Sequence, residues 1–142
     1  MLDPSLILNR HRQVPEVHMA EEKNLENRIK KFLKNQECWC LKYWAGGGFT
    51  KSGIPDLLIC CNGYFIGAEI KASNGTPSVL QIRELTKIQN ASGIGVLIYP
   101  EDEITFRKLI LELKVFNMRE AEVLQKKLED KVETWRKKYQ IT

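Results

Sequence analysis

Two carboxylates and a lysine surround a short turn in the middle of the sequence. Asp56 precedes one apolar run, and Asn62-Gly63 separates that run from the next. Glu69 and Lys71 close the second run. Asn-Gly strongly favours a two-residue hairpin, because a type I′ turn needs positive φ at both central positions. Counting outward from the turn places Asp56 directly opposite Glu69. Lys71 then lies on the same face as Glu69, since side chains alternate along a strand.

The opposed carboxylates predict a metal site for phosphodiester hydrolysis. Directly opposed β-carbons lie about 5 Å apart, so two carboxylates there repel each other. A divalent cation between Asp56 and Glu69 reverses this repulsion, and Mg²⁺ prefers such hard oxygen ligands. It would act as a Lewis acid on the phosphate and lower the pKa of a bound water. Lys71 would orient or deprotonate that water, or stabilise charge in the transition state. The structural alternative is a strand opened by Asp56 and an exposed ion pair between Glu69 and Lys71.

Hydrophobic periodicity predicts the elements that position these residues. We expect an α/β fold with a mixed sheet and helices on its faces, in the order α-β-β-β-α-β, followed by a C-terminal helical extension. The hairpin is antiparallel, and a helical crossover makes the last strand parallel to its neighbour. The expected helices cover residues 20–36, 78–91 and 105–138, the last broken near 115–118, and the expected strands cover 39–44, 56–61, 64–72 and 95–99.

Finer expectations concern the surfaces of these elements. The helix over 78–91 should turn Leu80, Ile82, Leu85 and Ile88 inward and stop at Gly93. Residues 45–53 form a glycine-rich loop that we expect to be flexible. We divide the chain into an N-terminal arm (1–18), a core (19–104) and the helical extension (105–142).

Bulk properties set limits on the class of protein. The chain has 142 residues, of which 43% are hydrophobic and 28% charged, which suits one globular domain. It has no apolar run of about 18 residues, as a membrane span needs, and no secretory signal pattern. We therefore expect a cytoplasmic protein without a membrane partner. The net charge of +4 is weak support for nucleic-acid binding. The four cysteines lack zinc-site spacing, and we interpret them as structural residues.

The same residues resemble a known nuclease family. Gly53-Ile54-Pro55-Asp56, followed by Ala68-Glu69-Ile70-Lys71, looks like the signature of the PD-(D/E)xK nucleases, which have a restriction-endonuclease-like core. With Lys42 before the glycine-rich loop and the segment Pro77–Gln81 after it, the chain resembles the virus-type replication–repair nuclease (VRR-NUC) domain. The likeness covers about residues 20–100.

This resemblance implies roles for individual residues. Asp56 and Glu69 would bind Mg²⁺ or Mn²⁺ together with the Ile70 carbonyl, and Lys71 would be the catalytic lysine. A glutamate of the first helix would reach the metal, for which we choose Glu26, with Glu22 as the alternative.

Roles are also expected for residues around this site. Gln81 is expected at the catalytic site, although Ser78-x-x-Gln81 is also a capping box. Lys42 would contact phosphate, or would be an edge-strand lysine that blocks sheet pairing. In the glycine-rich loop, Gly47, Thr50 and Lys51 are expected to contact DNA.

The resemblance also implies partners and a setting. Similar minimal proteins of phages and prophages are homodimeric endonucleases that cut branched DNA, such as Holliday junctions or flaps, in repair and recombination. An apolar stripe of Leu124, Leu128, Trp135 and Tyr139 would form a dimer interface or pack against the body of its own chain. The alternatives are a nicking or sequence-specific nuclease and a non-catalytic DNA-binding subunit that retains the fold.

Overall fold

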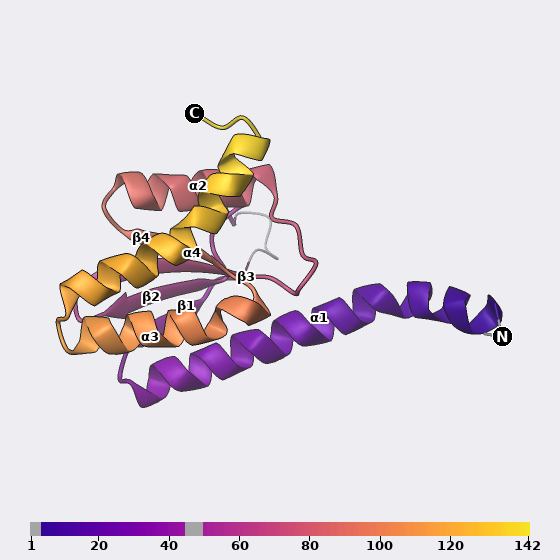
Figure 1. Cartoon of the computed structure of the whole chain (residues 1–142), viewed down its shortest axis with the longest axis horizontal. Helices are drawn as coiled ribbons and strands as arrows, with labels where there is room; N and C mark the ends of the chain where they lie inside the picture. The colour runs from indigo at the N-terminus through magenta and orange to yellow at the C-terminus, as the bar shows by residue number, and fades with distance from the viewer. Residues whose placement is uncertain (1–3, 45–49) are drawn as a thin grey trace.

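A four-stranded mixed sheet in the order β1-β2-β3-β4 forms the centre of the molecule (Figure 1). The structure is a computed structural model that describes residues 4–44 and 50–142, without the side chains of residues 4–15. The elements along the chain are α1 (Pro4–Asn35), β1 (Trp39–Lys42), β2 (Leu57–Cys61), β3 (Tyr64–Ile70), α2 (Val79–Asn90), β4 (Ile94–Ile98), the 3₁₀ helix η1 (Pro100–Asp102), α3 (Glu103–Lys114) and α4 (Met118–Lys138). This arrangement confirms the predicted fold class.

The hairpin between β2 and β3 has the predicted register. Its turn residues Asn62 and Gly63 have φ values of 50° and 87°, as a type I′ turn requires. The two strands pair from Cys61 with Tyr64 to Leu57 with Ala68. Because β3 and β4 are joined through α2, they run parallel, as a helical crossover imposes.

Helices cover the two faces of the sheet. α1 and α3 pack on one face and α2 on the other, while α4 contacts α3, β4 and α2. The main core combines residues of the sheet with Leu25 and Ile29 of α1 and with Phe106 and Leu109 of α3. A second cluster joins α2 and β4 to α4. Its buried members are Ile82, Leu85, Leu97, Tyr99 and Val132.

The first helix is longer than predicted. It begins at Pro4 rather than near residue 20, so the segment expected as an irregular arm is helical from Pro4 on. The N-terminal part of α1 extends beyond the rest of the molecule (Figure 1). A helix without a body to pack against needs no apolar stripe, and Pro15 removes one backbone donor without ending the helix here. Periodicity and proline position were therefore misleading in this segment.

The ends and faces of α2 differ in detail from the prediction. Ile82 and Leu85 are buried, but Leu80 is about half exposed, so its predicted inward orientation is wrong. The C-terminus has the hydrogen bonds of a Schellman motif, from Gly93 N–H to the Ile88 carbonyl and from Ser92 N–H to the Gln89 carbonyl. Ser92, with φ 68°, takes the left-handed position just before Gly93.

The C-terminal helices belong to the body of the molecule. The predicted break near 115–118 is confirmed, since α3 ends at Lys114 and Asn117 caps α4. Leu124 and Leu128 are buried in the main core, and Trp135 and Tyr139 pack on the second cluster. Of the two interpretations of this stripe, packing against its own chain is correct. None of the described helices has the length and apolarity needed to cross a bilayer.

Candidate metal centre

Asp56 lies at the entrance to β2, where the backbone of both neighbouring strands holds it. Tyr43 N–H donates to the Asp56 carbonyl at 2.9 Å, which continues the β1–β2 ladder. The side-chain Oδ2 accepts a hydrogen bond from Ile70 N–H at 2.9 Å. One carboxylate oxygen of Asp56 is therefore fixed by the adjacent strand, and the other, Oδ1, is left for a cation.

Glu69 is the most deeply buried carboxylate of the centre. It is 1% exposed, and Oε1 accepts from Gln81 Nε2 at 2.8 Å, with Lys71 Nζ at 3.6 Å. Oε2 has no hydrogen-bond partner among the described residues. Burial, followed by the charge of Asp56, raises the pKa of Glu69 to about 9. A buried carboxylate without a partner is costly, so this oxygen needs either a proton or a cation.

Gln81 completes the predicted capping box and also contacts Glu69. The side-chain Oε1 accepts a hydrogen bond from the Ser78 backbone N–H at 2.8 Å, and the Gln81 backbone N–H donates to Ser78 Oγ at 3.1 Å. Together they complete the capping box of α2. The amide nitrogen of the same side chain donates to Glu69. The cap thus orients the group that holds Glu69.

Lys42 places its ammonium group between two carboxylates. Lys42 Nζ contacts Glu26 Oε1 and lies 3.4 Å from Asp56 Oδ1. Lys23 and Lys30 approach the other Glu26 oxygen at 3.3 and 3.6 Å. Burial alone would raise the pKa of Glu26, but the contact with Lys42 outweighs it and lowers that pKa. Glu26 is thus buried, and three lysines compensate its charge.

Glu22 faces the same centre from one helical turn earlier. Burial raises its pKa, the charge of Lys71 opposes this rise, and the charge of Asp56 adds to it. Glu22 therefore shares the electrostatic environment of Asp56 and Lys71. Both helix glutamates remain candidates for the third carboxylate, since Lys42 contacts Glu26 while the charges of Lys71 and Asp56 act on Glu22.

The glycine-rich loop is described only in part. Gly47 lies outside the described residues, and Thr50 follows directly after the gap. Lys51 forms an ion pair with Glu84 at 3.1 Å, and its backbone N–H donates to the Tyr43 hydroxyl at 2.9 Å. The side chain of Lys51 remains largely exposed, so it can still approach a phosphate.

The prediction from sequence did not include the contacts of Lys23 and Lys30 with Glu26. Lys23, Glu26 and Lys30 have the i, i+3 and i, i+4 spacings that bring side chains together on a helix, and this signal was available. Trp44 was also missed. Its ring lies 5.9 Å from Lys23 Nζ and 5.8 Å from Lys42 Nζ, beside the cluster of lysines.

The donor set fits a hard divalent cation with few protein ligands. Within the described residues, no group of three or more histidine, cysteine, aspartate or glutamate side chains is arranged to hold a metal ion. A cation here would rely on Asp56 Oδ1 and Glu69 Oε2. Mg²⁺ commonly binds through one or two carboxylates and completes its shell with water and substrate oxygens. The orphaned Glu69 oxygen is the feature that such an ion would satisfy.

No family model, curated protein or solved structure matches the chain. The likeness to the VRR-NUC domain therefore depends on the motif residues alone and stays a prediction.

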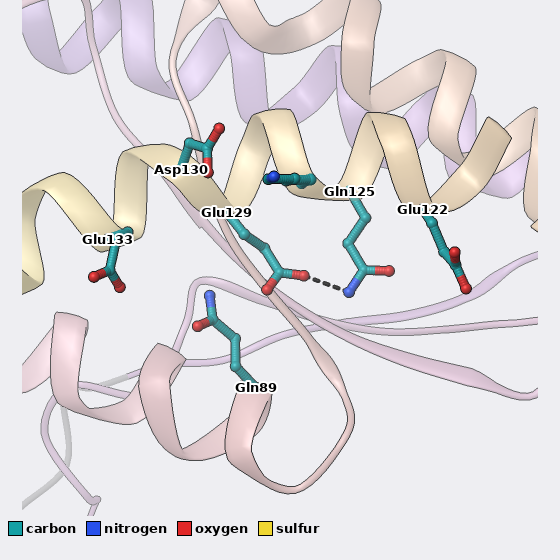
Figure 2. Close-up of a pocket in the computed structure, with 7 residues that line it drawn as sticks. Gln89, Glu122, Gln125, Glu129, Asp130 and Glu133 are labelled. Carbon is teal, nitrogen blue, oxygen red and sulfur yellow. Dashed lines mark hydrogen bonds between the residues drawn. The ribbon is translucent and has the colours of Figure 1, made fainter. Parts of the chain in front are cut away.

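A separate hollow between α2 and α4 has the wrong charge for DNA. Figure 2 shows it with Gln89 of α2 opposite the acidic side chains of α4. Its volume is about 390 Å³, and its charged lining residues are Glu122, Lys126, Glu129, Asp130 and Glu133. Four carboxylates against one ammonium would repel phosphate groups, so this hollow is not a candidate site for DNA.

Proposed function

We propose that the protein is a Mg²⁺-dependent DNA endonuclease of the VRR-NUC type. One observation carries this proposal: a buried glutamate, Glu69, has an oxygen that no described residue hydrogen-bonds, beside a second carboxylate, Asp56. An ionised Glu69 at this buried position is costly unless a cation binds there.

Each residue of the centre has a defined task in this proposal. Asp56, Glu69 and the Ile70 carbonyl would hold Mg²⁺ or Mn²⁺, which would supply a Lewis acid for the phosphodiester. Gln81 fixes the orientation of Glu69 through its hydrogen bond. Lys71 is largely shielded from solvent and close to Glu69, where it would orient the attacking water or stabilise negative charge on the phosphate.

The substrate and setting follow from the resemblance. We expect branched DNA as substrate, a homodimer as the active form, and a cytoplasmic protein of phage or prophage origin that acts in repair or recombination. A nicking or sequence-specific nuclease is the second candidate within the same chemistry. A non-catalytic DNA-binding subunit is disfavoured, because such a subunit has no use for the orphaned carboxylate.

The decisive experiment compares cleavage by the full chain and two matched variants. Labelled four-way junction, flap and linear duplex are incubated with Mg²⁺ and wild type, Asp56→Asn or Asp130→Asn. Asp130 is an exposed aspartate on α4, so its substitution controls for charge alone. We expect cleavage of a branched substrate by wild type and Asp130→Asn, and its loss in Asp56→Asn and in EDTA. Equal activity of Asp56→Asn would refute the site, while a preference for linear duplex would refute only the branch specificity.

A further inference from the structure

The outer half of one sheet face is apolar and uncovered. Trp39 of β1 pairs with Cys60 of β2, which pairs with Phe65 of β3, so these three side chains form a row across the sheet. Leu41 lies in the next row on the same face. Trp39, Leu41 and Phe65 are 57%, 48% and 44% exposed. α2, which covers this face, packs on β3 and β4, so β1 is left open.

The same region contains an edge of the sheet. In the part of the chain that the structure describes, β1 has a hydrogen-bonded neighbour on one side only. Just after β1, Tyr43 N–H donates to the carbonyl of Asp56, the residue before β2, so it points toward that strand. Because the direction of backbone groups alternates, the N–H and C=O groups of Cys40 and Lys42 point away from the sheet. An edge with apolar side chains is a template for pairing with another strand.

We infer that β1 and its apolar face form the interface of the homodimer on which the proposed function relies, by antiparallel pairing of the two β1 strands about a twofold axis at Leu41. Centring on Leu41 pairs Cys40 with Lys42 of the copy and Lys42 with Cys40 of the copy. All four outward backbone groups of each strand are then used. The two Leu41 side chains meet at the axis, and Trp39 meets Tyr43 of the copy.

Charge favours this partner over nucleic acid. None of the described side chains in the two rows is charged, whereas a DNA-binding surface needs cations to neutralise phosphates. Lys42, the one charged residue of β1, already contacts Glu26 and Asp56 and faces a cysteine in the dimer, not the other Lys42. The pairing therefore brings no like charges together.

The contact is small, which predicts a dimer that dissociates on dilution. A tryptophan carries up to about 250 Å² of surface, so the exposed part of Trp39 contributes roughly 140 Å² per copy. Stable complexes bury about 800 Å² per partner. Leu41 and the paired backbone of a four-residue strand add to this area, but the contact stays below that value. A single charge at the axis should then suffice to separate the copies.

The test measures the molar mass of the full chain by light scattering over a dilution series. Wild type should approach twice the chain mass at high concentration, and Leu41→Glu should stay at the chain mass. Leu111→Glu is the matched control, since Leu111 is a similarly exposed leucine on α3, and it should dimerise like wild type. A monomeric wild type, or a dimeric Leu41→Glu protein, would overturn the inference. A monomeric wild type in which Leu41→Glu weakens DNA binding would assign the face to nucleic acid instead.

A cysteine cross-link tests the register itself. Opposed residues of a non-hydrogen-bonded pair have Cα atoms about 4.5 Å apart, which lies within the about 4.4–6.8 Å range of disulfides. Leu41→Cys, oxidised with glutathione disulfide, should give a covalent dimer on non-reducing gels well above the wild-type background. Leu111→Cys should not exceed that background. Equal cross-linking of the two variants would refute pairing at Leu41.

Discussion

At the scale of single residues, the properties of the centre follow from the burial of Glu69. A carboxyl group with a pKa of about 9 is protonated in the metal-free protein at neutral pH. The unfolded chain releases the same proton near the usual value of 4.5. The folded state therefore binds the extra proton between these two values, and the stability of the metal-free protein falls as the pH rises through that range.

Binding of a divalent cation should release the Glu69 proton. Below about pH 9, we expect the affinity for Mg²⁺ or Mn²⁺ to rise with pH, by up to about tenfold per pH unit if one proton is displaced. Calorimetry in buffers of different ionisation enthalpy counts the released protons. Glu69→Gln should bind the metal weakly and release no proton. An affinity of wild type that is independent of pH would contradict this assignment.

Lys42 should compete with the metal for Asp56. Its ammonium group lies 3.4 Å from Asp56 Oδ1, the oxygen left free by the backbone. Lys42→Met should therefore bind Mn²⁺ more tightly, by up to about fivefold for a partly exposed pair. It should also lower the melting temperature of the metal-free protein, because Glu26 loses its closest counter-charge.

Lys30→Met is the matched control for Lys42. Lys30 lies 3.6 Å from Glu26 Oε2, so it shares the contact with Glu26 but has no ion pair with Asp56. Its substitution should leave the affinity for Mn²⁺ close to wild type. The same gain in both variants would mean that general charge, and not competition at Asp56, controls the metal.

At the scale of elements, one loop and one turn flank Asp56 and β2, the strand that follows it. Gly53 and Gly63 both have φ of 87°, a conformation that disfavours side chains. A Cβ at Gly53 would lie 2.7 Å from the Leu80 carbonyl oxygen in the first turn of α2, whereas a Cβ at Gly63 would meet open space. The segment before Asp56 is thus in close contact with the helix that carries Gln81.

Alanine substitutions at these two glycines should differ in their effect. Gly63→Ala should lower the free energy of unfolding by about 1–2 kcal/mol, from backbone strain alone. Gly53→Ala adds a clash with a backbone atom, so we expect a larger loss of stability and lower nuclease activity. Chemical denaturation and junction cleavage measure the two effects. Equal losses would show that the contact between Gly53 and α2 has little influence on the centre.

At the scale of the whole molecule, the C-terminal helices complete the core. Phe106, Leu109 and Ile110 of α3 are fully buried in the same cluster as the strands. Leu128 of α4 joins them, so only α1 would cover the face of the sheet opposite α2 if these helices were absent. The likeness to a known nuclease covers only about residues 20–100, which is less than the folded unit.

Truncation should show that cooperative folding depends on α3 and α4. A chain of residues 19–104 should lose cooperative thermal unfolding, because it exposes the apolar surface that α3 covers. A chain of residues 16–142 keeps the core residues of α1 and should unfold cooperatively like the full protein. Calorimetry distinguishes the two outcomes, and a cooperative transition in the shorter chain would contradict the view of α3 as part of the core.

The sequence alone determined the features that depend on local rules. Asn62-Gly63 fixed the hairpin register, because only a tight turn with two positive φ angles suits that dipeptide. That register placed Asp56 and Glu69 together, and the spacing of Ser78 and Gln81 predicted the cap. The crossover through α2 fixed the parallel strand. These features need only residues that are near one another in the chain.

The tertiary structure decided what depends on packing between distant segments. It showed that the Lys42 ammonium group lies between Glu26 and Asp56, and that Gln81 reaches Glu69 while it caps its helix. It also showed that Leu124 and Leu128 of α4 are buried in the core, whereas Trp39 and Leu41 are exposed. Periodicity shows that a face is apolar, but only the arrangement of the other elements determines what covers that face.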